Sequence, residues 1–297
     1  FALLNEAFAI DGVSLTTQRG AQRLCIELLH YASGSAASYP RTDVRVARGT
    51  HLHLIERHLS APDATSLTNG VVNVRLEPDA SLSHFRLQAH GPASSWIDSL
   101  DVEVGEGAAY RLHMASVGAH SARTTARVRL AGPRAQVAVH AAVVAEGQQT
   151  GDSYVRVEHA APDTRTEEVF RGIAAGRARV AFNAHIVVMQ GARGSDSRQS
   201  LRGLLAGPQA EIDARPQLEI YNDDVRCSHG ATAGKLDDAM LFYLLSRGIE
   251  PDIAQSLLKW AFLEDTVSRI DVPAWRAEVE RVLAAHLKDS TVSEGLV

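Results

Sequence analysis

Cys227 and His229 are the residues in this sequence whose types and spacing are best suited to metal or nucleophile chemistry. They lie two positions apart in EIYNDDVRCSHGATAGK. Alternate residues of a strand share a face, so an extended segment would place the thiol and the imidazole on one side. The pair could bind a soft metal such as iron, or the imidazolium could lower the pKa of the thiol. The competing interpretation is a strand end with a buried cysteine and a surface histidine, because two ligands do not close a metal site.

Two neighbouring motifs do not predict chemistry. GATAGK does not match a phosphate-binding loop, because only three residues separate Gly230 from Gly234 and Leu236 stands where magnesium binding needs Ser or Thr. We expect a glycine-rich start of a helix there. Asp223 and Asp224 are adjacent, so on a strand they would point to opposite faces, and we expect a solvated turn.

A histidine-rich stretch, HLHLIERH, contains His51, His53, Glu56 and His58. On a strand His51 and His53 share a face, and imidazole and carboxylate are common metal ligands. Two such histidines on an exposed strand are more often surface residues, so the metal interpretation is the weaker one. Cys25 lies among apolar residues in RLCIELL, and we expect it to be buried and unreactive.

The elements that must position these residues are strands. Apolar and polar residues alternate from about Val44 to Tyr221, as in VVNVRL, LDVEV and TARVRL, and GEGA, AGPRA and GARGS interrupt the pattern. A period of two predicts strands with one buried face. Because no helical segment intervenes and no strict repeat is evident, a sandwich, a barrel or a solenoid all fit. The inward residues would include Val72, Val74, Leu76, Leu100, Val102, Val104, Ala126, Val128 and Leu130.

The period becomes helical after His229. Three helices are predicted: one that ends at Gly248, one that opens at Pro251 and one that opens at Pro273. We therefore predict a β domain of residues 1–229 and a C-terminal helical domain of residues 230–297. The apolar stripes of the three helices are Leu236, Met240, Leu241, Leu244 and Leu245; Ile253, Leu257, Leu258, Ala261 and Phe262; and Trp275, Val279, Val282 and Leu283.

Composition excludes several classes of function. The chain has 297 residues and a formal net charge of −5, without a Lys/Arg-rich run, so nucleic acid is not an expected partner. No apolar run approaches the roughly 20 residues that span a bilayer, and the N-terminus does not look like a signal peptide. Two cysteines suit a reducing compartment. We expect a cytoplasmic protein that does not contact a membrane.

Residues 215–262 resemble the SufB/SufD family of iron–sulfur cluster assembly proteins. The shared elements are Pro216, Leu218–Glu219–Ile220, Asp224–Val225, Cys227, His229 and Ser246–Arg247–Gly248. The resemblance extends upstream through YPRTDVRVARGTHLHLIERH and GDSYVRVEHAAPDTRTEEVFRGI, although the family's N-terminal helical region is absent. Gly230 after His229, and the lack of a further cysteine in the β body, resemble the SufD branch. Ala184 and His185 depart from the glycine and basic residue that the family favours.

The resemblance implies a right-handed parallel β-helix, a solenoid, followed by a small C-terminal α-helical domain. It implies that such a chain is a scaffold and not an enzyme. SufB would pair with it through the terminal strands, and the ATPase SufC would bind the C-terminal helices. Cys227 and His229 would then form a metal site shared with SufB, holding a transient iron–sulfur cluster or iron. No cofactor is expected to bind the isolated chain tightly, and a homodimer is an open alternative for that chain.

Two rival functions stay open from the residues alone. The first is a carbohydrate-active enzyme on a β-helix, which needs acid and base groups gathered on one sheet face, and no such cluster is identifiable. The second is a stand-alone metal-binding protein that uses the many histidines. Iron content of the chain with and without SufB would separate this second rival from a shared-site scaffold.

Overall fold

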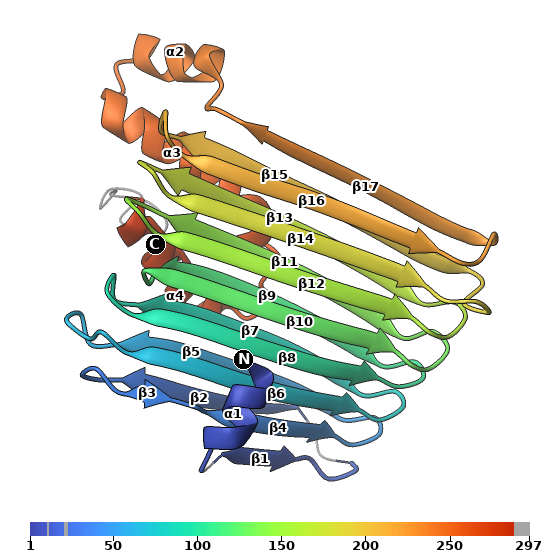
Figure 1. Ribbon diagram of the computed structural model, residues 1–297. Coiled ribbons are helices and arrows are strands. Elements are labelled where there is room, and N and C mark those ends of the chain that lie inside the picture. Colours follow the sequence, from blue (N-terminus) through green and yellow to red (C-terminus); the bar gives the residue numbers. More distant parts are fainter. Residues whose placement is uncertain (11, 21–22, 288–297) are drawn as a thin grey trace.

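The computed structural model describes residues 1–10, 12–20 and 23–287. In these residues the chain forms seventeen strands, arranged in two parallel sheets, and four helices. Figure 1 shows the strands stacked in two layers along one axis. Sheet A contains β1 (Val13–Thr16), β3 (Ala37–Ser38), β4 (Arg41–Val46), β6 (Leu67–Leu76), β8 (Ser95–Val104), β10 (Ser121–Leu130), β12 (Thr150–His159), β14 (Arg179–Val188) and β16 (Glu211–Ile220). Sheet B contains β2 (Leu24–Ala32), β5 (His51–Ser60), β7 (Ser81–His90), β9 (Ala109–Gly118), β11 (Gln136–Ala145), β13 (Arg165–Ala175), β15 (Ser195–Ala206) and β17 (Val225–Gly234).

Successive strands alternate between the two sheets over most of the chain. Each strand therefore pairs in parallel with the strand one coil earlier, as Ser121 of β10 pairs with Thr150 of β12. Such stacking buries a core that grows coil by coil, so small branched side chains are sufficient to fill it. The predicted parallel β-solenoid followed by C-terminal helices is confirmed.

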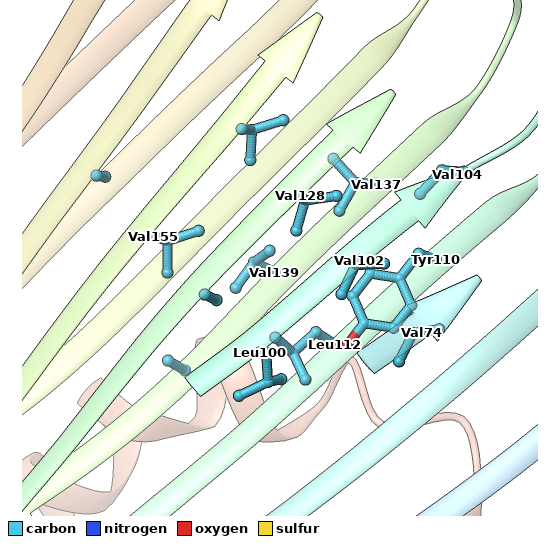
Figure 2. Close-up of a cluster of buried hydrophobic side chains, with 14 of the residues drawn as sticks. Val74, Leu100, Val102, Val104, Tyr110, Leu112, Val128, Val137, Val139 and Val155 are labelled. Atoms are coloured by element: carbon cyan, nitrogen blue, oxygen red, sulfur yellow. The ribbon is translucent and has the colours of Figure 1, made fainter. Parts of the chain in front are cut away.

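The core lies between the two sheets. Figure 2 shows side chains from both sheets, among them Leu100, Val102 and Val128 of sheet A and Leu112 and Val139 of sheet B, in the space that separates the layers. These five side chains are buried, and Leu100, Val102 and Val128 are among the residues predicted to face inward. Each buried Val or Leu side chain contributes about 1.5–3 kcal/mol.

A recurring turn joins the sheets at one side of the solenoid. Its central residue has a positive φ in successive coils, and these residues are 27 to 31 positions apart. Glycine occupies some of these positions at no steric cost, but Asp79, Arg134 and Asp163 each adopt a φ of 60°. The repeat is hidden in the sequence because its spacing and its residue type both vary. The residues are Gly49, Asp79, Gly107, Arg134, Asp163 and Gly194.

Two of the C-terminal helices cover the outer face of sheet B. Helices α3 (Pro251–Val267) and α4 (Pro273–His286) begin at their prolines as predicted, and their buried side chains join those of sheet B in one cluster. In α4 the predicted stripe is correct for Trp275, Val279 and Leu283. In α3 it is only partly correct: Leu257 and Ala261 are exposed, whereas Phe262 is half-buried and packs against the sheet B cluster. The buried face of α3 carries Ala254, Ser256, Trp260, Leu263, Thr266 and Val267.

Helix α2 (Asp238–Ser246) differs from the other two because it has no buried residue. The predicted inward stripe of this helix is therefore wrong for Leu245 and for Met240, which is 58% exposed, whereas Leu236, Leu241 and Leu244 are half-buried. Gly248 follows the helix with a φ of 80°, which fits its predicted role at the helix end. Figure 1 shows α2 beyond β17, at one end of the stack.

The first helix, α1 (Ala2–Phe8), lies against sheet A. The buried Asn5 side chain donates hydrogen bonds to the carbonyl oxygens of Pro40 and Asn69, 3.1 and 2.8 Å away. The predicted division between residues 229 and 230 falls within β17, which continues to Gly234. None of the helices in the described part of the chain is long and apolar enough to cross a membrane.

Candidate functional site

The last strand of sheet B, β17, carries Cys227 and His229. The strand is extended throughout, so the two side chains lie on the same face. Cys227 is half-buried and packs against the core, whereas His229 is exposed. β17 pairs with β15 on one side and ends the order of sheet B on the other. The thiol and the imidazole therefore stand at an open end of the solenoid.

Two rows of inward residues lead from the interior to this pair. Cys227 pairs in register with Ser197 of β15, and Ser197 pairs with Thr166 of β13. In the neighbouring row the partner of His229 is Gln199, which in turn pairs with Glu168. All four interior residues are buried: Thr166, Glu168, Ser197 and Gln199.

Glu168 and Gln199 form a buried hydrogen bond behind His229. The Gln199 amide donates to Glu168 Oε2 at 2.8 Å. Burial raises the pKa of Glu168 to about 8, and the hydrogen bond from Gln199 only partly opposes that rise. The carboxyl is therefore mostly protonated at neutral pH. Among the described residues, Glu168 Oε1, the amide oxygen of Gln199 and the hydroxyl of Ser197 have no hydrogen-bond partner.

The chemistry available at this end of the chain is limited by the number of ligands. Within residues 1–10, 12–20 and 23–287, Cys227 and His229 belong to no group of three or more candidate metal ligands. A tetrahedral metal or an iron–sulfur cluster normally takes more protein ligands than a thiolate and an imidazole. The pair can thus contribute to a site that a second chain completes, with a protonated carboxyl in the interior behind it.

Sequence reasoning missed Glu168 and Gln199. The signal that connects them is the coil period, since Glu168, Gln199 and His229 occupy equivalent positions on three successive strands of sheet B. That period becomes visible only when the coils are aligned, because their lengths differ.

The other motifs lie in different places. The GATAGK run continues β17 as an extended strand, so it is neither a phosphate-binding loop nor, in its first part, the start of a helix. Asp223 and Asp224 lie in the exposed turn before β17, as expected, where the carbonyl of Asp224 accepts a hydrogen bond from Gly194 at 2.7 Å. Cys25 is exposed on β2, so the expectation of a buried thiol is wrong.

The histidine-rich stretch forms β5 and divides between its two faces. His51 is exposed, and its ring bonds Ser81 at 2.5 Å. Glu56 and His58 are buried. Each continues the inward row of Leu52 and Leu54, so they lie inside the solenoid at the end opposite β17.

Comparison with known proteins points to one family. The family model described as "SUF system FeS cluster assembly, SufBD core domain" matches residues 29–262. The iron–sulfur cluster assembly protein SufD of Escherichia coli K12 is 30% identical over 268 residues, which cover 88% of this chain and 63% of that protein. The chloroplastic protein ABCI7 of Arabidopsis thaliana is 27% identical, over 78% of this chain and 49% of that protein. A SufBD family protein of Synechocystis is 26% identical, over 73% and 48% respectively. The chain therefore spans between about half and 63% of the length of these relatives.

Proposed function

The chain belongs to the SufBD family of iron–sulfur cluster assembly proteins, and we propose that it is a SufD-like scaffold subunit that pairs with SufB and binds the ATPase SufC. In this proposal the chain performs no covalent turnover of its own. It acts in the cytoplasm, where thiols stay reduced. The nascent cluster is its cargo and is held only transiently.

The observation that carries the proposal is the position of Cys227 and His229. Both lie on one face of the terminal strand of sheet B, at an end that no further coil covers. A pair that supplies two ligands at an open end is suited to a site that spans two chains. We propose that SufB supplies the remaining ligands for iron or for the growing cluster.

Pairing with SufB would use the open edges of β16 and β17. Each strand ends the order of its sheet, so half of its backbone donors and acceptors have no partner strand. Addition of strands from a second solenoid would satisfy these groups and exclude water from the junction. The same edges permit a homodimer when SufB is absent.

Binding of SufC is supported by the exposure of α2. Met240, Phe242 and Tyr243 are 58%, 71% and 57% exposed, which is unusual for large apolar side chains clustered on one short helix. Helices α3 and α4 direct their apolar faces to sheet B instead. We therefore assign the SufC contact chiefly to α2.

The test of the shared site is His229→Ala in the complex with SufB and SufC. Because His229 is exposed, the substitution should change the free energy of unfolding by no more than about 0.5 kcal/mol and should leave the complex intact on gel filtration. Iron and acid-labile sulfide per complex should fall severalfold. Ser228→Ala is the matched control, since Ser228 is the exposed neighbour on the other face of β17.

Normal iron and sulfide in an intact His229→Ala complex would remove His229 from the site. Failure of the wild-type chain to co-purify with SufB and SufC would reject the scaffold role itself. Cys227→Ala should have the milder effect if the thiol mainly packs against the core, as its partial burial suggests.

A further inference from the structure

A second group of possible metal ligands lies at the opposite end of the solenoid, where β2 ends sheet B. His30 of β2 pairs in register with His58 of β5, and their rings stack with centroids 4.7 Å apart and planes 4° from parallel. His30 Nε2 is 4.0 Å from Glu56 Oε1. One ligand atom from each of the three residues can be chosen so that all lie within 4.8 Å of one another. These residues are the only such group of three within the described parts of the chain.

Each of the three residues keeps an unused polar atom. Glu56 and His58 are fully or almost fully buried, at 0% and 2% exposure. Among the residues that the structure describes, His30 Nε2, Glu56 Oε1 and His58 Nδ1 have no hydrogen-bond partner. Unsatisfied atoms in a buried position are destabilising by about 1–3 kcal/mol each, so His30 Nε2 and Glu56 Oε1, which lie 4.0 Å apart, indicate a missing partner.

The surrounding charges leave room for a cation. Arg86 donates to Glu56 Oε2 at 2.5 Å, contacts Asp98, and donates to His58 Nε2 at 3.0 Å. Two carboxylates and one guanidinium give this buried cluster a formal charge of −1. His84 also bonds Glu56 Oε2, at 2.9 Å, and its other ring nitrogen bonds Tyr110. A buried carboxylate with an incompletely neutralised neighbourhood favours a bound cation.

The protonation states suit metal binding. Burial lowers the pKa of His58 to about 4 and also lowers that of His30, so both imidazoles are neutral at neutral pH. Burial opposes ionisation of Glu56, but Arg86 and then His84 outweigh it, and the pKa of Glu56 is well below its usual range. Neutral imidazole and ionised carboxylate are the forms that bind metals.

The cluster has a route to solvent. A surface pocket of about 170 Å³ is lined by His30, Tyr39, Thr68 and His90, among others. The His30 side chain is 19% exposed, so it connects the pocket with the buried Glu56 and His58. An ion could therefore enter at this end without opening of the solenoid.

We propose that His30, Glu56 and His58 bind one divalent first-row transition ion at the N-terminal end of the solenoid. Two imidazoles and a carboxylate are a ligand set typical of zinc and of non-haem iron. Ligands about 2.1 Å from a tetrahedral ion lie roughly 3.4 Å apart, so the three ligand atoms, which now lie within 4.8 Å of one another, must draw closer by about 1 Å. The ion also replaces Arg86 at His58, and Arg86 keeps its two carboxylates. This site would make the isolated chain a metal binder, in contrast to the expectation from the family resemblance.

The test is a Co²⁺ titration of the purified, chelator-treated chain. The visible d–d absorption of protein-bound cobalt measures the binding. Cys227→Ala with His229→Ala serves as the background, so that the proposed shared site cannot contribute. We expect one equivalent of Co²⁺ to bind and Zn²⁺ to displace it. Because binding to the folded state raises stability, Zn²⁺ should also raise the melting temperature.

His30→Ala should weaken Co²⁺ binding at least about tenfold, since loss of even an outer-shell partner has effects of this size. It should abolish the Zn²⁺-dependent rise in melting temperature. Glu56→Gln should also weaken Co²⁺ binding if this variant folds. If it does not fold, His30→Ala alone tests the proposal, because His30 lies at the edge of the sheet and is partly exposed. His51→Ala is the matched control, because His51 is exposed on β5 and should leave binding unchanged.

The proposal would be overturned by absence of stoichiometric Co²⁺ binding in the double-variant background, or by binding that His30→Ala leaves unchanged. Neither result bears on the cluster site proposed with SufB, because Cys227 and His229 are absent from this background. Loss of Co²⁺ binding in His51→Ala would likewise assign the metal to a surface site and reject this one.

Discussion

At the scale of single residues, the face on which a side chain lies decides its chemistry. His51 and His58 belong to one strand, yet one is exposed and the other is buried beside Glu56 and Arg86. Similarly, Glu168 lies inward, where water cannot solvate a charge, and its pKa rises as a result. Residue type alone does not predict these differences.

We expect Glu168→Gln to remove a loss of stability that the native chain shows as pH rises. The pKa of Glu168 is about 8 in the folded chain and about 4.5 in the unfolded chain. Between these values the folded state holds a proton that the unfolded state has released, so the free energy of unfolding falls by up to about 1.4 kcal/mol per pH unit. The decrease ends when Glu168 ionises near pH 8. Glutamine does not titrate, so the variant should lack this decrease in the free energy of unfolding.

Urea unfolding of both proteins between about pH 6.5 and 8 measures this difference. The window avoids most of the opposite effect of the buried histidines, such as His159, whose pKa burial lowers to about 4 from 6.5. Protonation of these histidines in the unfolded state lowers the free energy of unfolding as pH falls below about 6.5. Parallel curves for the native chain and Glu168→Gln would show that Glu168 is already ionised in the folded state.

At the scale of elements, the C-terminal helices have two different roles. α3 and α4 complete the outer face of sheet B: Trp275 contacts the ring of Phe85, and the guanidinium of Arg57 lies 5.2 Å from the Trp275 ring. Arg171 of β13 forms an ion pair with Asp265 of α3. These two helices are part of the solenoid's packing. α2 lies against α3 but has no buried residue, and it presents apolar side chains to solvent.

Met240→Glu combined with Phe242→Glu should abolish capture of SufC by the chain, because charges replace exposed apolar side chains at the proposed contact. The melting temperature should hardly change, since neither side chain is buried. Trp275→Ala is the contrasting variant: it should reduce the free energy of unfolding by about 3–5 kcal/mol through loss of core packing. A pull-down and a thermal melt measure the two effects. Undiminished SufC capture by the α2 variant would exclude α2 as the contact.

At the scale of the whole molecule, the solenoid has two unlike ends. The N-terminal end contains the cluster of half-buried His30 with buried Glu56 and His58, and the C-terminal end exposes the edges of β16 and β17. In β16 and directly after it, the N–H groups of Glu211 and Tyr221 bond to the preceding coil. Alternation then directs the N–H groups of Leu218 and Ile220 to the free edge. Pro216, which has no N–H, occupies another of these free-edge positions.

Ile220→Pro should therefore leave the fold intact and weaken pairing with SufB, because it removes one free-edge donor. The adjacent control is Tyr221→Pro, which removes the N–H that bonds Val188 at 2.9 Å and should destabilise the last coil. Gel filtration with SufB and circular dichroism of each variant distinguish the two effects. If both variants pair equally well with SufB, the β16 edge is not the interface.

The sequence by itself was sufficient for the family and for the shared face of Cys227 and His229, because the motif around Cys227 is contiguous. The alternation of apolar residues set the inward faces of the strands but fitted a sandwich, a barrel or a solenoid, and the parallel solenoid was implied by the family resemblance. Local signals also predicted helix boundaries: proline begins α3 and α4, and glycine follows α2.

Only the tertiary structure decided which residues meet across coils and which helix faces are buried. Glu168, Gln199 and His229, and likewise His30 and His58, become neighbours because strands of successive coils pair in register. The coils differ in length, so no constant spacing connects these residues in the sequence. α2 and α3 carry apolar residues on more than one side, and their burial depends on whether sheet B lies beneath them. Long-range pairing and the position of the sheet are properties of the packed chain, and no local pattern contains them.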